Sequence, residues 1–163
     1  GRKDLSRTNR KHIMDLILWR HAEAEDGIND LQRQLTPRGH KQAQQTAEWL
    51  RRHLPTNYSI IASQAKRSQQ TAQALGTEFR ICSDINPGCE AAAILAACNW
   101  GESNETVVVV GHQQTLGRLA SFLLAGSEME WSVKKSSVWW ISNRVRQSEP
   151  QTYLKAALLP ELM

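Results

Sequence analysis

The stretch Thr106-Val107-Val108-Val109-Val110-Gly111-His112 contains the clearest strand in the sequence. Its four consecutive valines form a short apolar run, which is typical of a strand covered on both faces. A histidine follows the strand after a single glycine, so a titratable side chain stands at its carboxyl end. In parallel sheets that end is where ligands bind.

Two earlier segments repeat this arrangement. An apolar run at residues 15–19 leads directly into Arg20-His21, and a second run at residues 58–62 leads into Ser63-x-x-x-Arg67. Helical patterns separate these strands. Thr36-Pro37 predicts the start of one helix, and Ser63 is a plausible N-cap for another that reaches about Leu75.

Further elements complete the pattern. Residues 79–81 predict an edge strand, residues 90–98 a helix, and residues 115–124 an amphipathic helix. Residues 137–141 and 153–158 predict two late strands. The alternation of strands and helices predicts an α/β fold, a three-layer α/β/α sandwich with a mostly parallel central sheet.

Composition indicates one ordinary domain. The chain has 163 residues, of which 40% are hydrophobic and 22% charged, as in soluble globular proteins. No apolar run approaches the ~20 residues of a membrane helix. We therefore expect a domain at residues 14–163 that lies in the cytoplasm and does not bind membranes.

The net charge of +4 is confined to the start of the chain. Residues 1–13 hold five basic residues and one acidic residue, and the remaining 150 residues are balanced. We interpret residues 1–13 as a polar basic leader: a tag, an upstream extension or a loose arm. A basic arm that grips phosphates is the alternative, but the neutral domain itself argues against a nucleic-acid partner.

Cysteine and histidine spacing does not favour a metal site or a disulfide framework. The three cysteines form no CxxC pair, and an odd number suits neither use. The histidines outside the strand ends have no telling ligand spacing. These residues are Cys82, Cys89 and Cys98, and His12, His40 and His53.

Three strand ends deliver Arg20, His21, Arg67 and His112 to one edge if their strands are neighbours. Two guanidiniums and two imidazoles describe an anion site, because the planar fork of arginine matches phosphate oxygens. A neutral histidine held among cations can attack phosphorus. A single histidine after a strand is more often a packed or capping residue, so the hypothesis rests on the agreement of three junctions.

The sequence resembles the histidine phosphatase superfamily. Residues 18–23 are similar to its Arg-His-Gly motif, residues 63–72 to its Ser-Pro…Arg-Ala…Thr-Ala segment, and residues 110–116 to its second-histidine segment. The short length, the stretch at residues 33–39 and the stretch at residues 134–138 resemble the SixA-type phosphohistidine phosphatases in particular.

The resemblance implies a phosphoglycerate mutase-like fold and a role for each matching residue. His21 would be the nucleophile that forms a phosphohistidine intermediate, and Arg20, Arg67 and His112 would complete the phosphate pocket. Water would then hydrolyse the intermediate without a metal or organic cofactor.

Two positions depart from the family pattern, and the general acid has no obvious equivalent. Ala22 replaces the usual glycine, and Gln64 replaces the usual proline. Glu23 is a candidate acid or substrate-binding residue, and Glu90 is a second candidate acid. Each has a simpler interpretation, Glu23 as a group that orients an arginine and Glu90 as an acidic residue in the first turn of a helix.

Three functions stay open from the sequence. The first is a phosphatase for phosphohistidine on a bacterial phosphorelay or phosphotransfer protein, because a phosphoramidate leaves with less help from an acid than an ester does. The second is a broad small-molecule phosphomonoesterase, and the third is a module that binds phosphate without catalysis. The sequence leaves the oligomeric state open.

Overall fold

The computed structural model describes residues 12–146 and 148–163. Their elements follow in the order β1 (His12–Arg20), η1 (Asp30–Gln32), α2 (Pro37–His53), β2 (Ser59–Ala62), α3 (Lys66–Gln73), β3 (Arg80–Ile81), η2 (Ser83–Ile85), α4 (Ala91–Ala97), β4 (Thr106–Gly111), α5 (Gln113–Ala125), β5 (Val138–Arg146), β6 (Glu149–Leu158) and η3 (Pro160–Leu162). The first strand begins at His12, two residues before the expected domain boundary. Residues 1–11 of the predicted leader lie outside the described residues.

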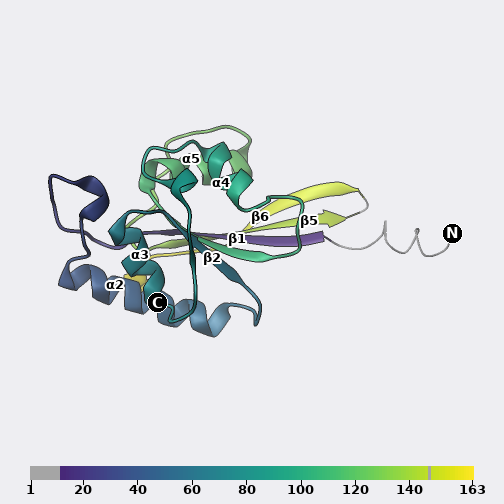
Figure 1. Ribbon diagram of the computed structural model, residues 1–163. Helices are drawn as coiled ribbons and strands as arrows, with labels where there is room; N and C mark the ends of the chain where they lie inside the picture. The colour runs from purple at the N-terminus through teal and green to yellow at the C-terminus, as the bar shows by residue number, and fades with distance from the viewer. Residues whose placement is uncertain (1–11, 147) are drawn as a thin grey trace.

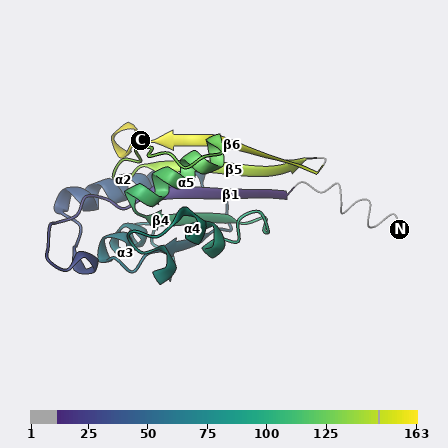
Figure 2. The same ribbon diagram turned by 90° about the horizontal axis from the view of Figure 1, so that it is seen from above.

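The strands form one six-stranded sheet in the order β3-β2-β4-β1-β5-β6. The first four run parallel, whereas β5 pairs antiparallel with β1, and β6 antiparallel with β5. Figure 2 shows β6, β5, β1 and β4 side by side. The mostly parallel sheet is confirmed, and the two late strands are longer than the sequence predicted.

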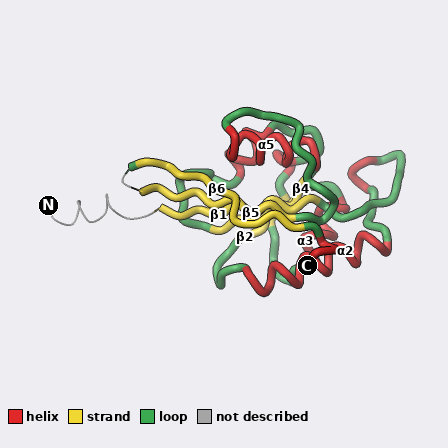
Figure 3. The backbone as a smooth tube through the Cα atoms, turned by 180° about the vertical axis from the view of Figure 1, so that it is seen from behind, coloured by secondary structure: helices red, strands yellow, loops and turns green. Residues whose placement is uncertain are grey.

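Helices cover both faces of this sheet, which confirms the three layers. In Figure 1, α4 and α5 lie on one side, and α2 and α3 lie on the other; Figure 3 shows α5 opposite α2 and α3 from behind. Alternate valines of β4 serve the two layers. Val109 belongs to the same core cluster as Leu119 of α5, and Val108 to the cluster that holds Leu50 of α2. Apolar burial on both faces accounts for the unbroken valine run.

Helix starts agree with the sequence at α2 and differ at α3. Thr36 Oγ1 accepts a hydrogen bond from the Gly39 N–H at 2.9 Å, and Pro37 is the first helical residue, as predicted. The prediction for Ser63 was wrong, because α3 begins at Lys66 with Ala65 as its N-cap. The Ser63 hydroxyl lies in a different hydrogen-bond network, described below.

Register aligns the strand ends that carry the polar residues. Val110 of β4 pairs with Trp19 of β1 on one side and with Ala62 of β2 on the other. The next positions are therefore level with each other. The His21 N–H donates to the Gly111 carbonyl at 3.1 Å, and the Ser63 N–H to the Val110 carbonyl at 3.3 Å. None of the described helices has the length and apolar character needed to cross a bilayer.

Candidate active site

The carboxyl edge of β1, β4 and β2 brings the predicted residues together. The ring centroids of His21 and His112 lie 5.2 Å apart, and Arg67 Nε lies 3.4 Å from His21 Nε2. The Arg20 guanidinium is close enough to lower the pKa of both rings. The condition on which the sequence hypothesis depended, that these strands are neighbours, is met.

In His21, one ring nitrogen is hydrogen-bonded to a backbone carbonyl and the other faces the Arg67 guanidinium. Its Nδ1 lies 2.7 Å from the Ala22 carbonyl oxygen, which can only accept, so Nδ1 carries the proton. Nε2 then keeps its lone pair. The pKa of His21 is lowered to about 3, mainly by burial; the Ala22 carbonyl opposes this shift, and the positive charge of Arg67 adds to it. The ring is therefore a neutral base at ordinary pH.

His112 is held by two serines through its Nε2. This atom lies 2.8 Å from Ser63 Oγ and 3.4 Å from Ser68 Oγ. Ser63 Oγ donates its proton to Ser68 Oγ at 2.9 Å, so it accepts from the ring and assigns the Nε2–H tautomer to His112. Burial is the main cause that lowers the pKa of His112 to about 3, followed by the charges of its neighbours. Sequence reasoning missed both serine contacts.

Arg20 supplies an unsatisfied donor to the site. Its Nη1 donates to the Val133 carbonyl at 3.0 Å, whereas its buried Nε has no partner among the described residues. Burial lowers the pKa of Arg20 below its ordinary value. A partly buried guanidinium with an unpaired N–H is a candidate binding group for an anion.

The Val133 carbonyl that accepts from Arg20 is itself held in place by α5. The Gln113 side chain donates to the Trp131 carbonyl at 2.8 Å and accepts from the Val133 N–H at 2.8 Å. It thereby clamps residues 131–133 against the start of the helix. The residue directly after His112 thus orients the loop that holds Arg20.

Arg67 is 3% exposed and pairs with a carboxylate that sequence reasoning missed. Its Nη2 lies 3.1 Å from Asp30 Oδ2, on the 3-10 helix η1 between β1 and α2. The loop that carries η1 protrudes from the end of the fold, at the left of Figure 1. The signal available in the sequence was Asp30 three residues before Arg33, the first residue of the segment similar to SixA-type proteins.

The two glutamates considered as acids lie in other environments. Glu23 Oε2 accepts from Thr36 Oγ1 at 2.8 Å, next to the N-terminus of α2. No described hydrogen bond joins Glu23 to the four pocket side chains. Glu90 is an exposed residue at the N-cap of α4. The substrate-binding role of Glu23 therefore stays a prediction.

Both departures from the family motifs fit this fold. Ala22 is fully buried with an ordinary backbone, since it is not among the positive-φ residues, and its N–H donates to Thr71 Oγ1 at 3.0 Å. Gln64 donates its backbone N–H to Asn86 Oδ1 at 2.8 Å. A proline could not make that bond, so the glutamine adds a contact between two loops.

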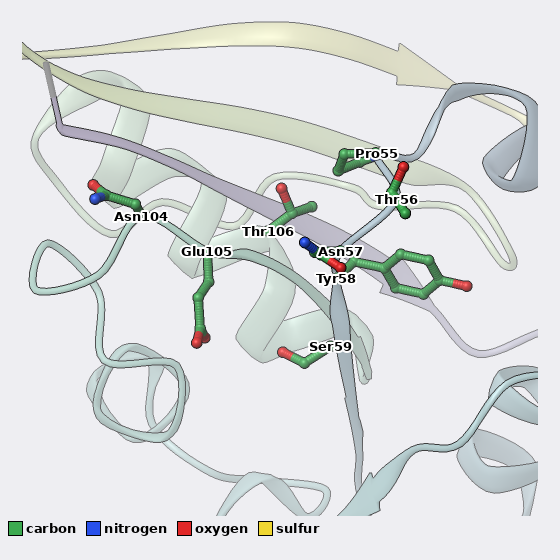
Figure 4. Close-up of a pocket in the computed structure, with 8 residues that line it drawn as sticks. All are labelled: Pro55, Thr56, Asn57, Tyr58, Ser59, Asn104, Glu105 and Thr106. Carbon is green, nitrogen blue, oxygen red and sulfur yellow. The ribbon is translucent and has the colours of Figure 1, made fainter.

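A separate pocket of about 460 Å³ lies away from these residues. Its walls come from the amino ends of β2 and β4 and from the segments before them, with Tyr58 and Glu105 among the lining residues (Figure 4). These strand ends are opposite the histidines. Among residues 12–146 and 148–163, no three His, Cys, Asp or Glu side chains gather as a metal site.

The family model of the histidine phosphatase superfamily (branch 1) matches residues 16–90. An uncharacterized protein of Mycobacterium tuberculosis is 32% identical over 118 residues, which cover 70% of this chain and 75% of that protein. The chain belongs to the histidine phosphatase superfamily.

Three further proteins are similar to this chain over a larger share of its length. A protein named phosphohistidine phosphatase SixA homolog, from Haemophilus influenzae, is 27% identical over 87% of this chain and 100% of its own. A candidate SixA from Nakamurella multipartitia is 26% identical with a TM-score of 0.75, covering 91% of this chain and 96% of that one. The histidine phosphatase SixA complexed with tungstate shares the fold, with a TM-score of 0.73 and 22% identity over 92% and 100% of the two chains. Superfamily membership and these relatives support a phosphatase with a phosphoglycerate mutase-like fold.

Proposed function

We propose that this superfamily member is a protein phosphohistidine phosphatase in which His21 Nε2 takes the phosphoryl group. The supporting observation is the state of the His21 ring. Nδ1–H donates to the Ala22 carbonyl, and the lone pair of Nε2 accepts the Nε–H of Arg67 at 3.4 Å. A neutral nucleophile next to guanidinium donors is what phosphoryl transfer requires, because catalysis depends on positioning and charge stabilisation.

The charges around the rings suit a phosphoryl dianion. The guanidiniums of Arg20, Arg33 and Arg67 all lower the pKa of His21, and Asp30 is the carboxylate paired with two of them. With both imidazoles neutral, three positive groups against one negative group leave an excess of two charges. Arg20 Nε offers an unpaired donor for one phosphoryl oxygen.

The reaction proceeds in two balanced transfers. In the first, the Nε2–P bond forms while the P–N bond of the substrate breaks, and the leaving imidazole nitrogen takes a proton from the solvent. The ring of His21 becomes cationic, and the Ala22 carbonyl stabilises its Nδ1–H. In the second, a water oxygen attacks phosphorus, the Nε2–P bond breaks, and inorganic phosphate leaves with the remaining proton released to solvent.

A phosphoramidate substrate fits the carboxylates present. The pKa of Asp30 is lowered by its hydrogen bonds and charge contacts with Arg67 and Arg33, against the opposing effect of desolvation. Glu23 is bound to Thr36. The ionised Asp30 has no proton to donate to an alkoxide leaving group, whereas a phosphohistidine nitrogen is readily protonated by the solvent. The proposed substrate is therefore a phosphorelay or phosphotransfer protein of the bacterial cytoplasm, where free thiols such as Cys82, Cys89 and Cys98 persist.

The covalent step is tested by trapping the intermediate. A ³²P-phosphorylated donor protein is mixed with wild type, His21→Ala and His53→Ala, and the reaction is stopped in alkaline detergent because N–P bonds are labile in acid. His53 is an exposed histidine bonded to the Trp49 carbonyl and serves as the matched control. We expect label on wild type and His53→Ala only. Equal label on wild type and His21→Ala contradicts the proposal and leaves the non-catalytic binding module.

The substrate class is tested by a comparison of kcat/KM. Wild type is assayed on a phosphohistidine protein and on a panel of small phosphate esters, including sugar phosphates and phosphoserine. We expect a preference for the phosphohistidine protein. A clear preference for the esters overturns the substrate class and identifies a small-molecule phosphomonoesterase with the same nucleophile.

A further inference from the structure

Both terminal nitrogens of the Arg67 guanidinium are taken by one residue. Nη1 donates to the Asp30 carbonyl oxygen at 2.7 Å, and Nη2 donates to the Asp30 carboxylate at 3.1 Å. Arg67 is almost completely buried, whereas the Asp30 side chain is 55% exposed. An exposed loop residue thus supplies the acceptors for a buried cation.

These contacts leave the third nitrogen of Arg67 directed at the nucleophile. The guanidinium is a rigid planar fork, so fixing two nitrogens fixes the direction of the third. Nε lies 3.4 Å from His21 Nε2, where a phosphoryl oxygen bound to that atom would be within reach. Asp30 therefore determines which N–H of Arg67 meets the transferred group.

Asp30 is in turn held in place on the opposite side. Arg33 Nε donates to Asp30 Oδ1 at 3.1 Å, and Arg33 Nη1 donates to the Glu25 carbonyl at 3.2 Å. One carboxylate oxygen faces each arginine. The protruding loop of residues 25–34 is thereby closed by its own side chains with Asp30 facing Arg67.

We propose that Asp30 is a positioning residue for phosphoryl transfer, which orients Arg67 toward the phosphoryl group on His21. This proposal rests on the proposed function and deepens it. The opposite effect is physically reasonable, since a carboxylate next to an anion site repels the anion and competes for the same guanidinium. Removal of the Asp30 carboxylate should weaken phosphate binding if Asp30 positions Arg67, and should strengthen it if Asp30 competes with phosphate.

The test measures binding of inorganic phosphate by calorimetry and turnover of the phosphohistidine protein by kcat and KM. Asp30→Ala removes the side-chain acceptor and keeps the backbone carbonyl. Asp30→Asn keeps an acceptor oxygen for Arg67 without the charge. Asp26→Ala is the matched control, because Asp26 is an exposed carboxylate of the same loop without a described ion pair.

Loss of a hydrogen bond to a charged group predicts phosphate binding about 10-fold weaker in Asp30→Ala. Recovery to within about 3-fold of wild type is expected in Asp30→Asn, and no change in Asp26→Ala. In Asp30→Ala, kcat should fall by a larger factor than KM rises, because misalignment of the Arg67 donor weakens mainly the stabilisation of the transition state.

Unchanged or tighter phosphate binding in Asp30→Ala overturns the proposal and shows a competing contact. An Asp30→Asn variant as defective as Asp30→Ala overturns it as well. Phosphate binding does not require turnover, so this result stands even if the trapping experiment contradicts the proposed phosphatase reaction. Conversely, if wild type is labelled and Asp30→Ala binds phosphate and turns over like wild type, the proposed phosphatase reaction stands and only the proposed role of Asp30 is rejected.

Discussion

The two histidines of the site carry their protons on different nitrogens. A backbone carbonyl fixes Nδ1–H in His21, and a serine hydroxyl fixes Nε2–H in His112. Each ring would have to rotate to lose its contact with this carbonyl or hydroxyl. The two imidazoles are therefore not equivalent: Nε2 of His21 keeps its lone pair, as the proposed nucleophile requires, whereas Nε2–H of His112 is bound to a serine.

The low pKa values of these rings predict a pH-dependent stability. The pKa of each ring is about 3 in the folded protein, against 6.5 for an unperturbed histidine, so between these values the unfolded chain binds more protons. Stability is then complete above pH 6.5 and falls as pH drops toward 3. At pH 5 the loss is roughly 2 kcal/mol for each histidine.

Urea unfolding at pH 7.5 and pH 5 measures this loss. His21→Asn should lose about half of the histidine contribution to the drop in unfolding free energy, while the carboxylates titrate alike in both proteins. Identical drops in wild type and variant would show that His21 is not neutral in the folded state.

Among the elements, α5 approaches the following loop more closely than a side chain permits. A Cβ built on Gly117 would lie 2.0 Å from the Trp131 carbonyl oxygen. This loop continues to Val133, whose carbonyl holds Arg20. The glycine therefore allows the contact between helix and loop that places the Val133 carbonyl against Arg20, a proposed phosphate-binding residue.

Gly117→Ala should therefore be harmful, although alanine is the better helix former. We expect a loss of roughly 1–3 kcal/mol of unfolding free energy from overpacking, together with weaker phosphate binding. Gln114→Ala, at an exposed position of the same helix, is the control and should cost little. Thermal unfolding and calorimetry measure both effects, and a stabilised Gly117→Ala would contradict the close contact.

Sequence patterns predicted some elements better than others. The Thr36-Pro37 start of α2 was correct because capping is local: the acceptor and the donor lie three residues apart. The Ser63 hydroxyl does accept from the Ala65 N–H at 3.3 Å, but α3 begins only at Lys66, and the same hydroxyl also contacts His112, 49 residues away. Propensity rules contain no information on such distant partners, which explains why Asp30 was also missed.

For the whole molecule, the valine run of β4 and the alternation of elements were sufficient for the three-layer architecture. The convergence of Arg20, His21, Arg67 and His112 followed from one rule about parallel strands. The antiparallel pairing of β5 and β6 was not predicted, because strand direction at the edge of a sheet depends on the path of the intervening loops. The orientation of each arginine likewise depends on loop carbonyls, at Val133 and Asp30, which have no sequence signature.

The alkylation rates of the cysteines can measure how often the folded structure opens. Cys82 and Cys98 are buried, and burial raises the pKa of Cys98 to about 12, whereas Cys89 is only partly buried. At pH 8 iodoacetamide should modify Cys89 first, because alkylation needs an accessible thiolate. Cys98 should react only when the fold opens.

Peptide mass spectrometry over a time course measures these rates. Addition of urea below the unfolding midpoint should accelerate the labelling of Cys98 far more than that of Cys89. Equal rates for the two thiols in native buffer would contradict a stable core beneath α4.

The position of β4 between β1 and β2 has a consequence for how the chain is made. The ribosome releases β1 and β2 long before the strand that must lie between them. Until about residue 111 has emerged, the two earlier strands have no common neighbour, and the ring of His21 has no partner ring. The slowest step of folding should therefore be the insertion of this late central strand, as expected for pairings between distant segments.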